Sequence, residues 1–451
     1  MNGWSYLPHT EEDRRRMMAV LGISDIEELF DDIPEEVRFR GALQVPERLS
    51  EVELDRHMTE LAGENRPAAE MACFLGAGAY DHHVPAVVDA MIGRGEFYTS
   101  YTPYQPEISQ GILQAIFEYQ TMVCELLGME VSNASMYDGA SATAEAALAA
   151  CAATHRSRVW VSDLLNPAYR RVIHTYCEAQ DVEVVAWRDT DGRSSAEALN
   201  ELDESVAALV VQYPNFLGIV EPLRDFARRA HEVGALLIVA AYPVALGVLE
   251  SPGACGADIA VAEGQPLGNP LSFGGPYLGL MASSRALMRR LPGRIVGQTV
   301  DTRGRRGFVL TLQAREQHIR REKATSNICS NQALNALAAT VYLAALGPGG
   351  LTDLAGLNLQ KAHYLFNRLT EIPGVEPLIP GAPFFNEFAL RLPVDPARVN
   401  RVLLQQGILG GLDLGEYRTD WRGGWLLAVT EKRTRAEMDR LVDAVKEGVR
   451  S

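Results

Sequence analysis

The sequence predicts a doubly wound α/β domain, preceded by a helical arm and followed by a smaller α+β domain. Short, continuously apolar segments recur between residues 159 and 282, and helix-like stretches separate most of them. Strands without an alternating polar face are typical of a mostly parallel sheet that helices cover on both sides. Apolar residues make up 47% of the 451 residues, enough for the large core that such a sheet needs.

A helical N-terminal arm is expected over residues 1–85. Three polar segments resemble helix starts, each with a capping side chain ahead of acidic residues: Thr10–Asp13, Ser24–Glu27 and Ser50–Glu53. Acidic side chains in a first turn interact favourably with the helix dipole. Prolines divide this region into short helices, so we expect an arm that lies on something larger.

The large α/β domain is expected over residues 86–310. An amphipathic helix should run from Ile108 to Leu127, where Gly128 ends it, and Asp138 should cap a helix of small residues. Two further helices are expected at 167–180 and 222–233. The apolar segments predict six strands, at 159–161, 182–187, 207–213, 236–241, 258–262 and 277–282.

A smaller α+β domain is expected over residues 311–451. Its pattern begins with two helices, 331–346 and 351–371, joined by a glycine- and proline-rich turn. The remaining elements expected are a strand at 385–392, a helix at 396–406, a strand at 425–430 and a helix from Thr434 onward.

Composition argues against several classes of function. With 42 basic and 58 acidic side chains the net charge is −16, which disfavours nucleic acid or an anionic membrane as the main partner. The most apolar stretch, residues 236–249, contains Pro243 and is shorter than the ~20 residues of a membrane helix. No signal-peptide pattern opens the sequence, and six widely spaced cysteines without a C-x-x-C pair indicate reduced thiols. We expect a cytoplasmic protein.

Lysine is scarce, and this limits the chemistry of the chain. It occurs only at Lys323, Lys361, Lys432 and Lys446, and every other basic residue is arginine. Arginine stays protonated, so no Schiff base can form in the first 322 residues. No metal site is expected either, because the adjacent His82 and His83 would chelate poorly and suit a structural role better.

Two segments are candidates for ligand binding at the ends of sheet elements. At Asp138, Gly139, Ser141 and Thr143, the start of a helix could offer backbone N–H groups and hydroxyls to an anion. The alternative is a capped helix packed closely against the sheet. The glycine- and proline-rich stretch 263–270 follows a strand, where ligands bind in α/β sheets, although it could equally be a structural elbow.

A third segment is a stiff aromatic loop between residues 95 and 107. Prolines restrict its backbone, and its polar and aromatic side chains suit a pocket or an interface; an aromatic minicore under the loop is the alternative. The candidate residues in this loop are Tyr98, Tyr101, Thr102, Tyr104, Gln105 and Glu107.

Together these segments resemble the P-protein of the glycine cleavage system, in particular the alpha subunit of its two-subunit bacterial form. The resemblance covers most of residues 70–346 in the family's order. It rests on four long motifs, at Tyr101–Gly111, Asn133–Ala140, Gly264–Gly268 and Arg321–Cys329.

The resemblance implies fold type I of the pyridoxal-phosphate enzymes. It also implies decarboxylation of glycine and transfer of the aminomethyl group to the lipoyl arm of H-protein. Such enzymes need a lysine for the internal aldimine and a carboxylate beneath the pyridine ring. Here the corresponding positions read Ala-Ala-Tyr-Pro at 240–243 and Glu-Gly-Gln-Pro at 263–266. Tyr242 and Gln265, with the helix start at 138–143, therefore belong to a cofactor pocket that looks vestigial.

We therefore expect no catalytic or cofactor-binding residue in this chain. The resemblance implies that a beta subunit holds the pyridoxal phosphate in an α2β2 complex that acts on glycine with lipoylated H-protein. The aromatic loop is expected to face the active site of that beta subunit. Two alternatives stay open: a non-catalytic scaffold or regulatory subunit of the same complex, and a self-sufficient pyridoxal enzyme that uses Lys323.

Overall fold

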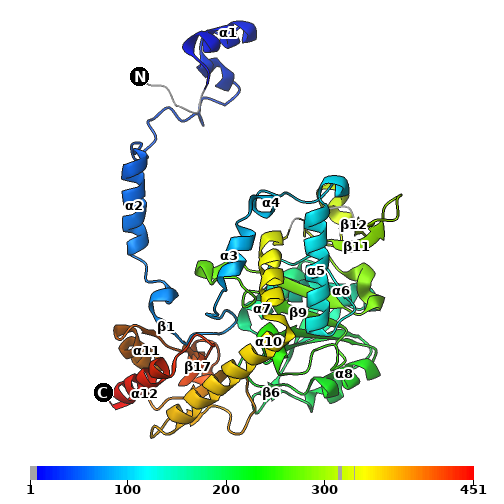
Figure 1. The fold of residues 1–451 in the computed structure, drawn as a ribbon, viewed down its shortest axis with the longest axis vertical. Helices are drawn as coiled ribbons and strands as arrows, with labels where there is room; N and C mark the ends of the chain where they lie inside the picture. The colour runs from blue at the N-terminus through cyan, green and yellow to red at the C-terminus, as the bar shows by residue number, and fades with distance from the viewer. Residues whose placement is uncertain (1–7, 313–316, 330, 451) are drawn as a thin grey trace. The chain divides into compact units, whose positions relative to one another are not determined.

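The computed structural model describes residues 8–312, 317–329 and 331–450 (Figure 1). It divides into two compact units, Met1–Arg66 and Pro67–Ser451. In the first unit the helices are α1 (Glu11–Leu21), the 3-10 helix η1 (Ile26–Phe30) and α2 (Glu51–Gly63). All three begin where the sequence predicts, and each has a capping box. None of the described residues 8–66 is buried.

The second unit is built around a seven-stranded sheet with the order β2-β10-β9-β8-β7-β3-β4. Neighbours from β9 to β4 pair in parallel, and β10 pairs antiparallel with both β9 and β2. The predicted mostly parallel sheet is therefore confirmed. The strand bounds are β2 Val131–Ser132, β3 Arg158–Ser162, β4 Glu183–Trp187, β7 Val206–Tyr213, β8 Leu236–Ala241, β9 Ile259–Glu263 and β10 Gly279–Ser283.

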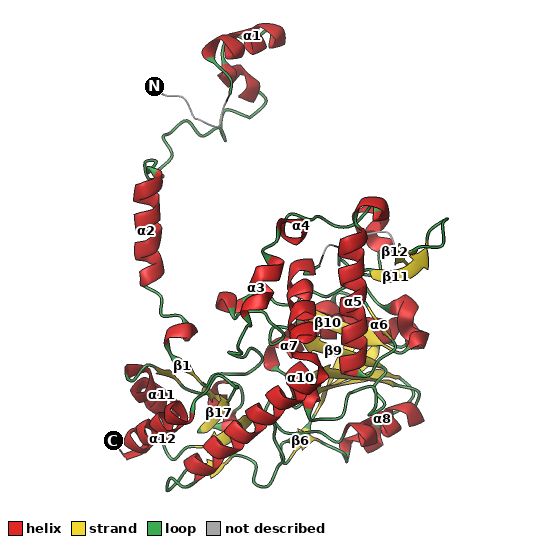
Figure 2. Cartoon of the chain, in the orientation of Figure 1, coloured by secondary structure: helices red, strands yellow, loops and turns green. Residues whose placement is uncertain are grey.

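Helices cover both faces of this sheet, which explains its continuously apolar strands. Successive residues of β7 and β8 alternate between two cores: Val210 and Ile238 point to one, Leu209 and Leu237 to the other. The first core includes α6 and α7, and the second includes α5, α8 and α10 (Figure 2). The helix bounds are α5 Gln110–Leu127, α6 Gly139–Thr154, α7 Pro167–Glu178 and α8 Leu223–Glu232.

Two predicted helix signals are confirmed in detail. The Asp138 side chain caps α6, and Gly128 ends α5 in the left-handed conformation with φ 68°. Smaller elements of this part are α3 (Ala86–Ile92), α4 (Gly95–Tyr98), η3 (Pro106–Ile108) and the hairpins β5–β6 (Asp189–Thr190, Arg193–Ser194) and β11–β12 (Ile295–Val300, Arg306–Thr311).

A four-stranded sheet with the order β13-β14-β17-β16 and the helices from α9 to α12 complete the described part of the unit. The helix α10 (Ala333–Thr370) is broken at Gly347, where φ is 63° and ψ 179°, as the predicted turn there requires. The other bounds are α9 Gln317–Arg320, β13 Glu376–Pro377, β14 Glu387–Arg391, α11 Pro396–Gln405, β16 Leu412–Asp413, β17 Gly424–Ala428 and α12 Arg435–Arg450. The short strand β1 (Ala72–Cys73) pairs with β15 (Ile408–Leu409), so residues 72–73 join this part of the fold. The domain boundaries at 85 and 310 stay predictions.

Within the described part of the chain, α10 alone is long and apolar enough to be considered as a membrane span. It packs on α3, α5 and the 3-10 helix η5 (Pro243–Gly247). Because of these contacts and the break at Gly347, we interpret it as a core helix of the second unit.

Candidate functional site

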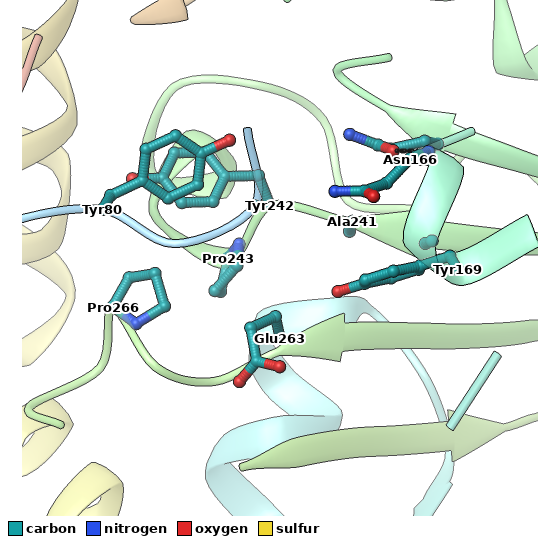
Figure 3. Close-up of a pocket in the computed structure, with 11 residues that line it drawn as sticks. Tyr80, Asn166, Tyr169, Ala241, Tyr242, Pro243, Glu263 and Pro266 are labelled. Atoms are coloured by element: carbon teal, nitrogen blue, oxygen red, sulfur yellow. Dashed lines mark hydrogen bonds between the residues drawn. The ribbon is translucent and has the colours of Figure 1, made fainter. Parts of the chain in front are cut away.

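A small cavity lies where β8 and β9 end, at the carboxyl edge of the parallel strands (Figure 3). Its volume is about 30 Å³, space for roughly one or two water molecules. The residues that line it are Gly78, Tyr80, Asn166, Tyr169, Gln212, Ala240, Ala241, Tyr242, Pro243, Glu263 and Pro266. Of the predicted vestigial pocket positions, only Tyr242 lines this cavity.

Two tyrosines whose rings contact each other at a tilt fill one side of the cavity. The rings of Tyr80 and Tyr242 have centroids 4.5 Å apart, and Figure 3 shows them side by side above Pro243 and Pro266. Tyr80 donates its hydroxyl to Glu387 Oε2 at 2.9 Å. Burial raises the pKa of both phenols well above the ordinary value, so both stay protonated.

A buried chain of hydrogen bonds holds Tyr242. Its hydroxyl contacts His82 Nε2, and His82 Nδ1 lies 2.7 Å from Glu431 Oε2. Burial alone would raise the pKa of Glu431, but hydrogen bonds from His82 and from the backbone N–H of His83 lower it to about 2. Glu431 is therefore an ionised acceptor, and the His82 ring connects it to the Tyr242 hydroxyl. The Tyr242 hydroxyl is therefore engaged in these hydrogen bonds.

The carboxylate of Glu263 closes the opposite side of the cavity. Glu263 is the last residue of β9, and its carboxylate accepts hydrogen bonds from three backbone N–H groups: Gly139 at 2.9 Å, Gln265 at 3.0 Å and Leu278 at 3.2 Å. Burial raises its pKa to about 7, although those donors favour the ionised form. Gly139 is the first residue of α6, so this side chain occupies the helix N-terminus that the sequence marked as an anion site.

The hydroxyls expected to bind an anion are used within the helix. Ser141 donates to the carbonyl oxygen of Asp138 at 3.1 Å, and Thr143 donates to that of Gly139 at 2.6 Å. Asp138 accepts from the backbone N–H of Ser141 at 2.7 Å. In this structure backbone carbonyls in the same turn are their acceptors, and a role for these hydroxyls toward an anion stays a prediction.

Gln265 is buried behind the cavity and fixes the loop at 263–270. Its amide accepts from the backbone N–H of Tyr80 at 3.0 Å and donates to the carbonyl of Tyr80 at 3.1 Å and of Asn269 at 2.9 Å. Gln265 therefore links this loop to the segment that contains Tyr80.

None of the four lysines lines the cavity. Lys323 is exposed, Lys361 donates to the carbonyl of Glu431, Lys432 pairs with Asp81 at 2.6 Å, and Lys446 pairs with Asp443 at 2.9 Å. Among the described residues, no group of three or more His, Cys, Asp or Glu side chains is placed to hold a metal ion.

The aromatic loop lies outside the cavity and presents its side chains outward. Tyr98 is 69% exposed and Tyr101 78% exposed, and Gln105 and Glu107 are also exposed. Tyr104 is half-exposed, with the Arg294 guanidinium 5.3 Å from its ring centroid; Thr102 is half-buried. Beneath the loop an apolar cavity of about 100 Å³ is lined by residues that include Phe97, Tyr98, Ile112, Ile116, Tyr119 and Leu337.

Sequence reasoning missed most of the residues that shape the cavity: Tyr80, Asn166, Tyr169, Glu387 and Glu431. Their hydrogen-bond partners lie far away in sequence; the Tyr80–Glu387 pair, for example, spans 307 residues. No local pattern marks such pairs. The one available signal was Glu263, a charged residue at the end of an apolar strand.

Comparison with known proteins assigns relatives along nearly the whole chain. A family model described as glycine cleavage system P-protein matches residues 4–445. A protein of Desulforamulus reducens named "Probable glycine dehydrogenase (decarboxylating) subunit 1" is 55% identical over 97% of this chain and 98% of its own. The protein of the same name from Brevibacillus brevis is 56% identical over 97% of both chains.

A comparison with solved structures finds the same family. An inhibitor-bound glycine decarboxylase (P-protein) of the glycine cleavage system has 49% identity and a TM-score of 0.90, with 99% of this chain and 100% of that chain covered. An aspartate aminotransferase from Thermus thermophilus has 19% identity and a TM-score of 0.59 over 84% and 99% of the two chains. The second likeness is one of fold alone. The predicted fold type I is confirmed.

Proposed function

The chain belongs to the glycine cleavage system P-protein family, and on that premise we propose that it is the first of two unlike subunits of a glycine decarboxylase. The other subunit, beta, holds pyridoxal phosphate, which supplies the electron sink for decarboxylation. The two subunits form an α2β2 complex in the cytoplasm. Glycine is the substrate, and lipoylated H-protein accepts the aminomethyl group.

The observation that carries this proposal is that the pocket at the ends of β8 and β9 does not fit pyridoxal phosphate. Ligand pockets measure roughly 300–1,000 Å³, at least about tenfold more than this cavity. No lysine lines it, and β8 ends in Ala240 and Ala241 without a carboxylate. The adjacent rings of Tyr80 and Tyr242 take up the space at its edge. A decarboxylase of this family therefore needs its cofactor on another chain.

The aromatic loop supports a partner at a defined surface. Exposed tyrosines that lie together are typical of the centre of protein interfaces, since they bury much area at a small cost in side-chain entropy. Tyr101 and Tyr104 have ring centroids 6.1 Å apart, and Ile108 beside them is 81% exposed. The apolar cavity under Tyr98 and Phe97 offers room for an apolar side chain of the partner. We place this loop against the active site of beta.

The N-terminal unit supports a partner through a separate observation. Sixteen of the 29 large apolar side chains that are exposed in the described chain lie between Met17 and Leu61. A segment that leaves so much apolar surface in water is stabilised when another surface covers it. We infer that beta covers the arm, and that self-association is disfavoured because residues 1–66 carry 16 acidic and only 8 basic side chains on an already acidic chain.

Reconstitution tests the proposal. The two subunits are purified separately, and glycine–bicarbonate exchange is measured for each alone and for the mixture with lipoylated H-protein. We expect exchange only in the mixture, and cofactor absorbance near the aldimine band only in preparations that contain beta. Full exchange by beta alone would overturn the proposal.

The same experiment separates the two alternatives. Aldimine absorbance in this chain alone that disappears in Lys323→Ala would support a self-sufficient enzyme; Lys323 is exposed and lies outside the cavity lining. A complex that assembles fully and keeps its turnover when the aromatic loop is altered would support a scaffold.

A further inference from the structure

The N-terminus of α6 is built like an anion site, but a side chain of the same chain fills it. The first N–H groups of a helix lack partners within the helix, and the helix dipole gives them a partial positive charge. Phosphates and carboxylates bind there. In this chain Glu263 Oε2 lies 2.9 Å from the backbone nitrogen of Gly139, the first residue of the 16-residue helix.

We propose that Glu263 is a built-in anionic ligand that keeps this site closed to phosphate groups. Its carboxylate takes the position that the phosphate of a free ligand would otherwise occupy at the start of α6. The pocket is therefore closed to phosphorylated ligands by a specific residue, in addition to lacking a lysine.

The surroundings of Glu263 fit this role. Its three hydrogen-bond partners are all backbone donors: one in α6, one in the loop that follows Glu263, and Leu278, which immediately precedes β10. Among the ion pairs of the described residues, none involves Glu263. A carboxylate buried without a cation is costly, and backbone N–H groups at a helix start are what can offset that cost.

The packing explains why anion and side chain exclude each other. A Cβ on Gly139 would lie 2.1 Å from Tyr169 Oη and 3.0 Å from the Glu263 nitrogen, so the helix start has no spare room. Figure 3 shows Glu263 at the end of its strand, with the hydroxyl of Tyr169 directed toward the same space. Truncation of Glu263 to alanine would join the vacated volume to the neighbouring cavity and leave the N–H donors without an acceptor.

Titration with inorganic phosphate tests the proposal on the purified full chain, without beta. Wild type is compared with Glu263→Ala and with Glu263→Gln, in which the amide still fills the space. We expect Glu263→Ala to bind one additional phosphate per chain by calorimetry, with a thermal midpoint that is below wild type in chloride and rises with phosphate at constant ionic strength. Glu263→Gln should gain no phosphate site.

Glu387→Ala is the matched control. Glu387 is also a carboxylate largely removed from water, but it accepts from Ala77 N at 2.6 Å and from Tyr80, away from any helix start. We expect it to lose stability without recovery in phosphate. The same number of phosphate sites in Glu263→Ala as in wild type would overturn the proposal.

A second variant keeps the proposal testable if Glu263→Ala does not fold. If Glu263→Ala is unfolded in chloride, Glu263→Ser is examined by circular dichroism in chloride and in phosphate. Folding of either variant in phosphate but not in chloride supports the proposal; failure of both variants in both buffers overturns it. Because no readout involves exchange, this result is independent of the reconstitution test.

Discussion

The tyrosines around the cavity and the tyrosines of the aromatic loop lie in opposite environments. Tyr80 is 5% exposed and its hydroxyl is bonded to Glu387, whereas Tyr101 is 78% exposed. In the cavity, polar groups are satisfied by the chain itself, as in a structural core. In the loop, rings and hydroxyls face outward, as at a binding surface. The comparison teaches that side chains of this chain nearly fill the pocket position, whereas the loop leaves its side chains in solvent, and for that reason we propose the loop as a surface for a partner.

The same substitution in the two regions should have very different effects on stability. In Gly139→Ala the new Cβ would meet Tyr169 Oη at 2.1 Å, whereas at Gly95, in the loop, no atom lies within 4 Å. We expect Gly139→Ala to lower the free energy of unfolding by about 3 kcal/mol or more, and Gly95→Ala to change it by less than about 0.5 kcal/mol. Urea unfolding measures both, and equal losses would contradict the comparison.

The pocket carboxyls should make stability depend on pH in a defined direction. Burial raises the pKa of Glu263 and of Glu387 to about 7, above the ordinary 4.5. The folded state then binds protons more tightly than the unfolded state, so the free energy of unfolding should fall as pH rises from 4.5 through 7. The loss is at most roughly 3 kcal/mol for each group.

Unfolding free energies measured between pH 5 and 8 test this. Glu263→Gln and Glu387→Gln should each flatten the decline, whereas Glu107→Gln, at an exposed carboxylate of the loop, should leave it as in wild type. Glu431 contributes little in this window, because its pKa is lowered to about 2 and its stabilisation is lost as pH falls from about 4.5 to about 2. If the pH dependence of the unfolding free energy is the same in both pocket variants as in wild type, the raised pKa values of Glu263 and Glu387 are contradicted.

In the loop, hydroxyl removal should affect turnover rather than stability. Tyr101→Phe and Tyr104→Phe keep the ring and remove one donor each. If these hydroxyls act in the beta active site, exchange by the assembled complex should fall about tenfold, equivalent to about 1.4 kcal/mol. Tyr417→Phe, at an exposed tyrosine outside the loop, is the control. Unchanged kinetics in both loop variants, with the complex assembled, would show that the loop tyrosines only pack and that their hydroxyls do not act in the beta active site.

The difference between the regions also explains what the sequence could predict. The helix after Asp138 and the strands β3, β4, β7, β8, β9 and β10 follow from local signals, namely a cap and apolar runs, and they are confirmed. The missing lysine was also visible. The sequence does not reveal the roles of Glu263 and Tyr80, because their hydrogen-bond partners are distant along the chain. Glu263 accepts from Gly139, 124 positions away, and Tyr80 donates to Glu387, 307 positions away.

The smallest effects are expected from the two hydroxyls at the start of α6. Ser141 and Thr143 donate to carbonyl oxygens of Asp138 and Gly139, and Glu263 already occupies the helix terminus. Ser141→Ala removes one half of a capping box, which costs about 1 kcal/mol or less. Thr143→Ala removes a hydroxyl bonded to its own helix, which should matter even less. Neither change opens a site, so exchange by the reconstituted complex should equal wild type at every phosphate concentration. Phosphate-dependent turnover that disappears in these variants would show instead that an anion at this helix start takes part in the reaction. The pocket would then contribute to function, as we propose for the loop.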